Sequence, residues 1–175
     1  MQLVFPAVAY KDSFMEAVGE FVASDTSERG ERYKEYVDEI AEKGFERFVE
    51  EEKSHARGEN LREGYVPVTT LWLIDGGEFV GRVSIRHRLN DYLQRVGGHI
   101  GYDIRPSKRK QGYGTTLLRL ALPEARRIGL ERLLVTCDAT NEGSRKVIEN
   151  NGGVLENSEI DELSGVERLR FWIDV

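Results

Sequence analysis

Two glycines that follow a basic run form the stretch of this sequence best suited to chemistry. Residues 100–104 are typical of a strand, residues 105–110 carry four cations, and Gln111-Gly112-Tyr113-Gly114-Thr115 leads into a helical pattern. Glycine lets the backbone turn its N–H groups toward a ligand, and a helix N-terminus adds unpaired donors and a partial positive charge. The stretch therefore predicts a phosphate-binding loop for a ligand with several phosphates.

Three phosphate-binding patterns compete for this loop. A Walker A loop requires a lysine where Thr115 stands, and the dinucleotide fingerprint requires a third glycine at the position of Leu117. The pattern that remains is Arg109-x-x-Gly112-x-Gly114 directly after a strand. It resembles the pattern with which the GCN5-related N-acetyltransferases, the GNAT superfamily, hold the pyrophosphate of acetyl-coenzyme A through backbone amides.

A second stretch extends the resemblance. The apolar run 133–138 is followed by Asn141-x-x-Ser144-x-x-x-Ile148-x-x-x-Gly152. Family members carry an asparagine, a small residue and a glycine in this order and spacing, at a strand-to-helix corner beside the pantetheine arm of the cofactor. The resemblance covers roughly residues 66 to 175, with its motifs between 99 and 153.

The resemblance implies acetyl-coenzyme A as co-substrate, with no metal, and direct attack of an amine on its thioester. It also implies a backbone N–H at Ile104 or its flank that stabilises the oxyanion. The residues expected to bind the cofactor are Ile104, Arg109, Lys110, Gln111, Gly112, Tyr113, Gly114, Thr115 and Asn141.

A base is needed because a lysine ammonium has a pKa near 10.4 and an α-amino group a pKa of about 7.7 to 8.0. Some family members place a glutamate at the position of Gly98, so that base is missing here. His99 is the first candidate in its place, acting directly or through water. Asp103, on the same face of the strand, and His87 are the next candidates.

A proton donor for the departing thiolate is equally open. Many family members have a tyrosine seven residues after the corner asparagine, where Ile148 stands here. Tyr102 or Tyr113 is a substitute, or solvent protonates the thiolate. The absence of the usual glutamate at Gly98 and of the usual tyrosine at Ile148 also leaves a second hypothesis, a non-catalytic sensor that binds coenzyme A.

The single cysteine, Cys137, excludes a disulfide framework and a cysteine-rich metal site. It lies in an apolar run without an evident histidine partner. A buried packing position is therefore favoured over a nucleophile.

Length and composition indicate one domain over residues 1–175, with a helical substrate-side segment at 1–65 and a cofactor-binding core at 66–175. No apolar run approaches eighteen residues and no signal segment begins the chain, so we expect a cytoplasmic protein without a membrane partner. The net charge of −6 argues against nucleic-acid binding. A homodimer is left open.

The net negative charge of the chain comes from its first third. Residues 1–66 hold 16 acidic and 9 basic side chains, and residues 67–175 hold 15 and 16. These carboxylates attract a cationic amine or simply form solvated helix faces, and the second interpretation is favoured.

Apolar periodicity predicts the elements that position these motifs. Helices are expected from Asp12 with Phe14, Ala17, Val18 and Phe21 on one face, and over 31–53 with its aromatic residues in the core. A hairpin is expected at 66–74 and 79–85. The segments expected after it are a connection at 90–98, a strand from His99, a helix ending at Gly129, a strand at 131–138, a helix at 142–151, and strands at 154–156 and 166–174.

The fold class that follows is α/β, a mixed and mostly antiparallel twisted sheet of six or seven strands with helices on both faces. The resemblance implies acyl-coenzyme A-dependent N-acyltransfer, most simply of acetyl, to a small amine or a protein amino group. A longer acyl group or a hydroxyl acceptor is a further alternative. Fold does not fix the substrate.

Overall fold

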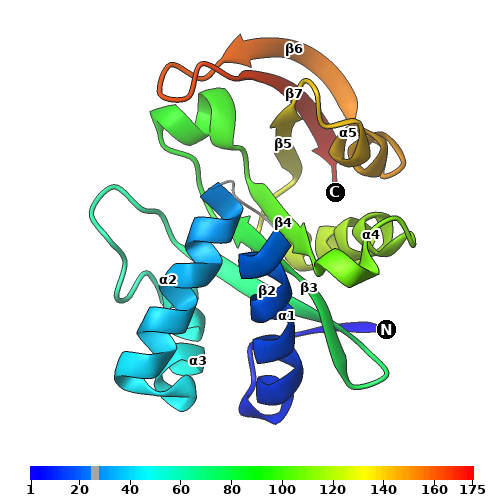
Figure 1. The fold of residues 1–175 in the computed structure, drawn as a ribbon. Coiled ribbons are helices and arrows are strands. Elements are labelled where there is room, and N and C mark those ends of the chain that lie inside the picture. The colour runs from blue at the N-terminus through cyan, green and yellow to red at the C-terminus, as the bar shows by residue number, and fades with distance from the viewer. Residues whose placement is uncertain (25–27) are drawn as a thin grey trace.

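A seven-stranded sheet runs through the molecule with helices on both faces (Figure 1). The computed structural model describes residues 1–24 and 28–175. The strands are β1 Gln2–Val4, β2 Val68–Asp75, β3 Glu78–Arg86, β4 Ile100–Ile104, β5 Arg132–Asp138, β6 Val154–Ile160 and β7 Glu167–Asp174. The longer helices are α1 Lys11–Ser24, α2 Glu28–Lys43, α3 Phe45–Ser54, α4 Tyr113–Arg127 and α5 Glu142–Glu149.

The strand order is β1-β2-β3-β4-β5-β7-β6. Neighbouring strands are antiparallel in every pair except β4 and β5, which are parallel. This confirms the predicted mixed and mostly antiparallel sheet.

Alternation along the strands divides the core in two, because successive side chains point to opposite faces. On β2, Leu71 and Leu73 pack with α4 and β5, whereas Trp72 and Ile74 pack with the aromatic side chains of α1, α2 and α3. The ring of Trp72 stacks on that of Phe14 with a centroid separation of 4.5 Å. The sheet is therefore held between two hydrophobic layers.

The first third of the chain forms the helical layer on one face. Helix α1 buries Phe14, Ala17, Val18 and Phe21, as predicted. The prediction of one helix over 31–53 is wrong. Gly44 has φ 84°, which the helix cannot accommodate, and the chain divides there into α2 and α3.

Two aromatic residues of α2 lie in this layer. Tyr33 is 0% exposed and Tyr36 is 9% exposed, and both belong to the cluster around Phe14. The core interpretation of these aromatic residues is confirmed.

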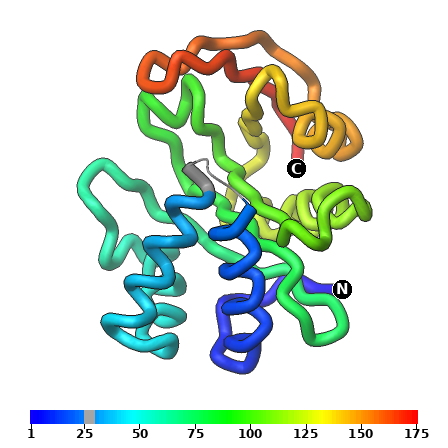
Figure 2. Tube along the Cα trace, in the orientation of Figure 1, coloured from blue at the N-terminus to red at the C-terminus, as the bar shows by residue number. Residues whose placement is uncertain are grey.

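The connection between β3 and β4 contains a helical turn, Leu93–Gly97, that the sequence patterns did not predict. The side chain of Asn90 caps it by accepting a hydrogen bond from the N–H of Leu93 at 2.9 Å. Figure 2 shows this turn beside the hairpin of β6 and β7, far away in sequence. The Leu93–Gly97 turn thus forms a wall at the end of the sheet where β4 begins.

The sheet splits between β4 and β5. Among the described residues, Ile100 and Val135 are the one pair that lies in register between these strands. Beyond this pair the strands diverge (Figure 1). Strand β4 remains paired with β3 along its whole length, from Ile100 to Ile104. An opening therefore lies in the middle of the sheet, bordered by the free edge of β4.

Candidate active site

A cavity of about 270 Å³ lies at the split. Strands β3, β4, β5 and β7, helices α2 and α5 and the Leu93–Gly97 turn all contribute to its wall. The polar side chains in this wall are Arg32, Arg86, Tyr92, Tyr102, Asp103, Thr136, Asp138, Asn141, Ser144 and Arg168. The mixture of both charges, hydroxyls and an amide is typical of a binding site.

The free edge of β4 presents backbone groups to this cavity. Hydrogen bonds from the N–H of Arg86 to His99 O and from the N–H of Arg105 to Val80 O, both 2.8 Å, fix the pairing of β3 with β4. Residues that bond to a neighbour alternate along an antiparallel pair, so the N–H groups of Tyr102 and Ile104 point toward the split. The Ile104 flank expected to stabilise an oxyanion therefore faces the opening.

The predicted phosphate loop has the geometry of an anion cradle. Gly112 has φ 83° and is the N-cap residue of α4, and a Cβ atom at this glycine would meet nothing within 4 Å. In the described part of the chain, the first amide of the helix to make a backbone hydrogen bond is that of Thr116, which donates to Gly112 O at 3.1 Å. Among the described residues, none accepts a hydrogen bond from the amides of residues 111–115.

Gly114 allows the loop to approach helix α5. A Cβ atom on Gly114 would lie 3.1 Å from Cγ2 of Val147 and 3.8 Å from Cγ1 of Ile104. The cradle is thereby held against the end of β4, beside the split.

The basic run is less cationic than its sequence suggests. Arg105 is buried and pairs with Glu20 at 2.7 Å and with Glu16 at 3.3 Å, and Lys108 pairs with Glu78 at 2.6 Å. The guanidinium of Arg109 donates to Ile104 O at 3.1 Å and lies over the Phe21 ring. Arg105 and Lys108 are thus neutralised within the fold.

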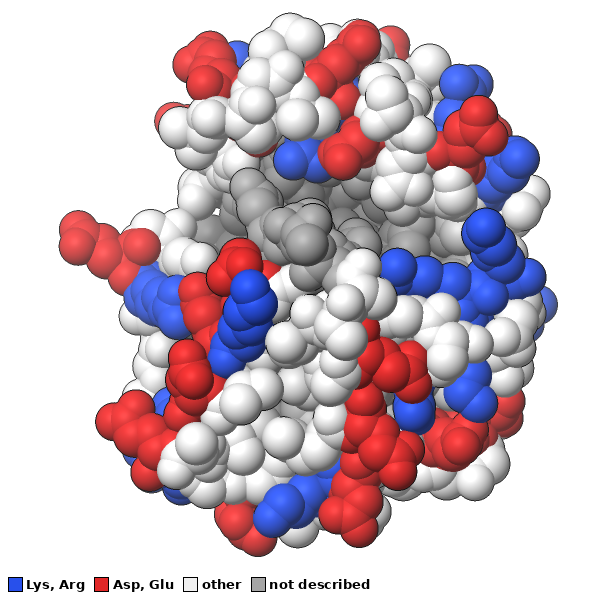
Figure 3. All heavy atoms as spheres, in the orientation of Figure 1, with Lys and Arg blue, Asp and Glu red and all other residues white. Residues whose placement is uncertain are grey.

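Figure 3 shows Lys and Arg side chains gathered on the right of the viewed face, over the region of α4. Asp and Glu crowd the lower part of that face, over the helical layer. Among the described residues, no carboxylate of the acidic first third lines the main cavity. This distribution agrees with the interpretation of those carboxylates as solvated helix faces.

A pair of hydroxyl groups lies in the cavity. The phenol of Tyr102 donates to Oγ of Ser144 at 3.1 Å. Asn141 caps α5 by accepting the N–H of Ser144 at 3.0 Å, so the start of this helix places the serine. Tyr113 donates instead to Asp75 at 2.9 Å and does not line the cavity, and Ile148 is fully buried. Of the two candidate tyrosines, Tyr102 is the one at the split.

His99 ties the two strands together at the closed end of the split. Its ring Nδ1 accepts a hydrogen bond from the backbone N–H of Leu134 at 2.9 Å, and the backbone N–H of His99 donates to Leu134 O at 2.7 Å. The residue is 9% exposed and is not part of the cavity wall. Burial, together with the charge of Arg86, lowers the pKa of His99, so its neutral form is favoured.

The other two candidate bases lie apart from one another. Asp103 lines the cavity and is 6% exposed, and it accepts a hydrogen bond from Nη1 of Arg32 at 3.2 Å. His87 lies past the end of β3, where its Nε2 is 2.8 Å from Oγ1 of Thr69, and it does not line the cavity. The structure therefore brings Asp103, but neither histidine, to the cavity.

The backbone explains why residue 98 is not a glutamate here. Gly98 has φ 67° and ψ −179°, a region that side chains strongly disfavour. A Cβ atom there would also lie 2.6 Å from Leu134 O. No side chain fits at this position without moving the junction of β4 and β5.

Cys137 borders the cavity from β5, but it is only 5% exposed and packs in the core. Burial, assisted by the charge of Asp138, raises the pKa of its thiol to about 11.

We expect iodoacetamide to alkylate Cys137 about 100-fold more slowly at pH 8 than a cysteine in an unfolded peptide, because the thiolate is the reacting form. The rate should rise about tenfold per pH unit up to pH 9.5 while the protein stays folded. A rate that levels off below pH 9 would contradict the raised pKa. Mass spectrometry of the labelled protein measures the rate, with circular dichroism as the control for folding.

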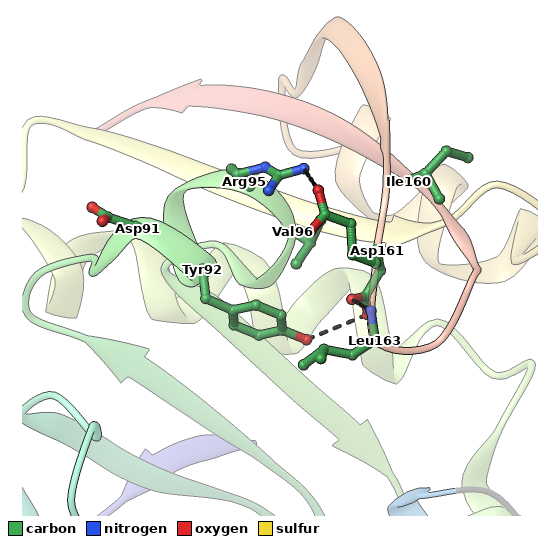
Figure 4. Close-up of a pocket in the computed structure, with 8 residues that line it drawn as sticks. Asp91, Tyr92, Arg95, Val96, Ile160, Asp161 and Leu163 are labelled. Atoms are coloured by element: carbon green, nitrogen blue, oxygen red, sulfur yellow. Dashed lines mark hydrogen bonds and ion pairs between the residues drawn. The ribbon is translucent and has the colours of Figure 1, made fainter.

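A second cavity of about 250 Å³ adjoins the first, and Tyr92 and Val96 line both. Figure 4 shows the Tyr92 phenol pointing from the Leu93–Gly97 side toward Asp161 in the β6–β7 hairpin, to which it donates at 3.3 Å. Asp161 is 2% exposed and also accepts from the N–H of Leu163 and the hydroxyl of Ser164. The hydrogen bond from Tyr92 to Asp161 therefore holds the β6–β7 hairpin over one end of the site.

Sequence reasoning missed most of the charged wall of the main cavity. It did not single out Arg32, Tyr92, Asp138 or Arg168 as site residues, and it named Ser144 only as part of a motif. Arg82 and Arg86 on β3 offered one usable signal, because charged residues four apart in an otherwise apolar strand share one face.

The family comparison bears directly on this site. A family model described as an acetyltransferase (GNAT) domain matches residues 14–154. The chain belongs to the GNAT acetyltransferase family. The match spans the helical layer, the cradle and the corner at Asn141, so the recognition made from two motifs is confirmed.

Solved structures of GNAT acetyltransferases share the fold. The microcin C7 self-immunity acetyltransferase MccE, bound to acetyl-CoA and AMP, is 17% identical, with a TM-score of 0.68 and coverage of 99% of this chain and 91% of that one. RimJ of Mycobacterium smegmatis, in complex with CoA-disulfide, is 18% identical, with a TM-score of 0.67 and coverage of 99% and 81%.

A third GNAT structure is the acetyltransferase of Salmonella typhimurium that modifies the N-terminal serine of ribosomal protein L7/L12. It is 18% identical, with a TM-score of 0.63 and coverage of 99% and 94%. No curated protein sequence matched the chain. At these identities the three structures establish the fold alone.

No group of three or more His, Cys, Asp or Glu side chains that could hold a metal ion occurs among residues 1–24 and 28–175. Within the same ranges, no helix has the length and apolar character needed to cross a membrane.

Proposed function

We propose that the protein transfers an acyl group, most simply acetyl, from acyl-coenzyme A to an amine. The observation that carries this proposal is the cradle of amides at residues 111–115, which no described residue occupies and which lies against the end of β4 at the split. A pyrophosphate suits these donors and the N-terminal charge of α4. MccE, which shares this fold, is seen with acetyl-CoA bound.

The cofactor contacts follow from the same geometry. The backbone of residues 110–115 would hold the pyrophosphate, with Lys110 and Arg109 supplying charge. The pantetheine arm would extend along the free edge of β4 toward Asn141 on the far side of the split, where it finds the backbone groups of Tyr102 and Ile104.

When bound, the thioester supplies the activated acyl group. We infer that Asp103 receives the acceptor ammonium and accepts its proton, because it is the candidate base that lines the cavity. His99 and His87 remain weaker proposals. An N–H on the edge of β4 would donate to the carbonyl oxygen as it gains charge. Ser144, whose oxygen accepts from Tyr102, would donate its hydrogen to the departing sulfur and take the proton of the phenol in its place. The second proton lost by the acylated nitrogen would return to the phenol through solvent.

A sensor that binds coenzyme A without catalysis is the second candidate. The buried position of Ile148 favours it, because that residue offers no proton. The hydroxyl pair of Tyr102 and Ser144 in the cavity favours catalysis instead.

Thermal melting with acetyl-CoA tests the cofactor site. We expect the melting temperature of the intact protein to rise with acetyl-CoA, since a ligand at 100 times its Kd adds about 2.7 kcal/mol. Gly112→Asp should abolish that rise, because a carboxylate would stand inside the cradle. Gly129→Asp is the matched control, since Gly129 also has a positive φ, of 96°, open space around its Cβ position, and a place at the opposite end of α4.

Release of free coenzyme A thiol over a panel of amines then separates the two candidates. Turnover with any amine supports the acyltransferase. A cofactor-dependent rise without thiol release over the whole panel supports the sensor. No rise in the intact protein, or an equal rise in Gly112→Asp, would overturn the proposed cofactor site.

A further inference from the structure

Among the described residues, the charges that line the main cavity do not cancel. This part of its wall holds three arginines and two aspartates. Arg32 pairs with Asp103 at 3.2 Å, and Arg168 pairs with Asp138 and lies 3.7 Å from Asp161. Arg86 has no carboxylate within ion-pair distance in the part of the chain that the structure describes. The described part of the wall thus carries an excess positive charge at Arg86.

Two backbone carbonyls hold the Arg86 guanidinium in place. Its Nη1 donates to Gly97 O at 3.2 Å and to Gly98 O at 2.9 Å. Its Nη2 lies 3.8 Å from the point where a Cβ atom would stand on Gly101, so the group extends over this glycine. A guanidinium has five N–H donors, and carbonyls engage one of its nitrogens here. The N–H groups of its other two nitrogens, Nε and Nη2, remain as donors beside the cavity.

The environment of Arg86 favours an anion in front of it. Burial and the neighbouring guanidiniums of Arg32 and Arg82 lower the pKa of Arg86, which marks an uncompensated positive charge. Guanidinium groups bind carboxylate and phosphate oxygens in pairs, with better geometry than an ammonium offers.

The spacing of the two ends of the cavity limits the size of such a ligand. Gly101 and Asp103 lie two residues apart on β4 and so face the same side, about 7 Å from one another. An amine at Asp103 and an anion at Arg86 would therefore be separated by a few covalent bonds. A cavity of about 270 Å³ also fits a small molecule.

We propose that the acceptor is a small amine that also carries an oxyanion, a carboxylate or a phosphate, and that Arg86 binds this group. The inference rests on the proposed function, because it assigns the acceptor of the same site. It also distinguishes this site from one built for polyamines, in which carboxylates rather than an arginine would face the substrate.

Two matched pairs of acceptors test the proposal by thiol release. Alanine and alaninamide differ in a carboxylate, and phosphoethanolamine and ethanolamine differ in a phosphate. The members of a pair also differ in amine pKa, so the decisive quantity is the change in their kcat/KM ratio between protein variants. We compare the intact protein with Arg86→Gln and Arg86→Lys, and with Arg88→Gln as control, since Arg88 is exposed and lies outside the cavity wall.

The expected result is a preference for the anionic member of at least one pair that falls about ten- to hundredfold in Arg86→Gln, mainly through KM. Arg86→Lys should recover part of it, and Arg88→Gln should leave it unchanged. The pair that responds identifies carboxylate or phosphate as the group bound. Equal ratios in the intact protein and Arg86→Gln would overturn the proposal.

A binding measurement covers the case in which no acceptor turns over. Alanine or phosphoethanolamine, at constant ionic strength, should raise the melting temperature of the intact protein but not that of Arg86→Gln. No rise with either ligand, in a protein that still responds to acetyl-CoA, overturns the acceptor assignment and leaves the proposed function standing. Loss of the acetyl-CoA response in the intact protein would instead overturn the proposed function.

Discussion

Replacement of Ser144 by alanine is expected to lower kcat for acetyl transfer about 100-fold, with little change in the KM for acetyl-CoA. The physical reason is that Ser144 accepts the phenol of Tyr102 at 3.1 Å and therefore directs its own hydrogen elsewhere in the cavity. A thiolate that leaves without a positioned donor carries its full charge. Steady-state thiol release measures the effect.

Tyr102→Phe and the double variant show whether the two hydroxyls act together. If the phenol supplies the proton through the serine, Tyr102→Phe should also lower kcat, and the double variant should be no worse than Ser144→Ala alone. Ser144→Thr keeps a hydroxyl and should recover part of the activity. An unchanged kcat in Ser144→Ala, with chemistry as the slow step, would show that solvent protonates the thiolate.

The second large effect is on stability. Gly98→Ala should lower the free energy of unfolding by about 2 to 6 kcal/mol, from backbone strain of about 1 to 3 kcal/mol and displacement of packed groups of about 1 to 3 kcal/mol. The Cβ atom would lie 2.6 Å from Leu134 O, at the point where β4 meets β5. Urea unfolding followed by circular dichroism measures the change.

Gly77→Ala is the control for Gly98→Ala. Gly77 has φ 88° and no atom within 4 Å of its Cβ position, so its substitution carries the backbone strain without the contact. A larger loss in Gly98→Ala than in Gly77→Ala is expected. Equal losses would mean that the strand junction moves freely to accept a side chain, and a glutamate at residue 98 would then be structurally possible.

Much of the fold could be predicted from the sequence because apolar periodicity is a local property. The hairpin of β2 and β3 and the buried face of α1 follow from alternation and from spacings of three and four. The break at Gly44 was missed because the flanking residues keep a helical pattern on both sides. The Leu93–Gly97 turn was missed because its cap and its contacts with the β6–β7 hairpin come from outside its own pattern.

The candidate site likewise contains parts that follow from local sequence and parts that depend on distant contacts. The loop at Gly112 and the corner at Asn141 are contiguous in sequence, and their glycines and cap have local causes, so they were visible as motifs. Arg32, Arg86 and Arg168 come from three elements, and no spacing in the sequence links them.

By itself, the sequence determined the family, the sheet class and the segment that forms the cradle, because each depends on residues close together along the chain. Only the tertiary structure decided which polar groups face the cavity. The parallel pairing of β4 with β5 ends after Ile100, and this split exposes the edge of β4 to side chains from distant elements. The charge left over at Arg86 is a sum over those elements, so it exists only in the folded protein.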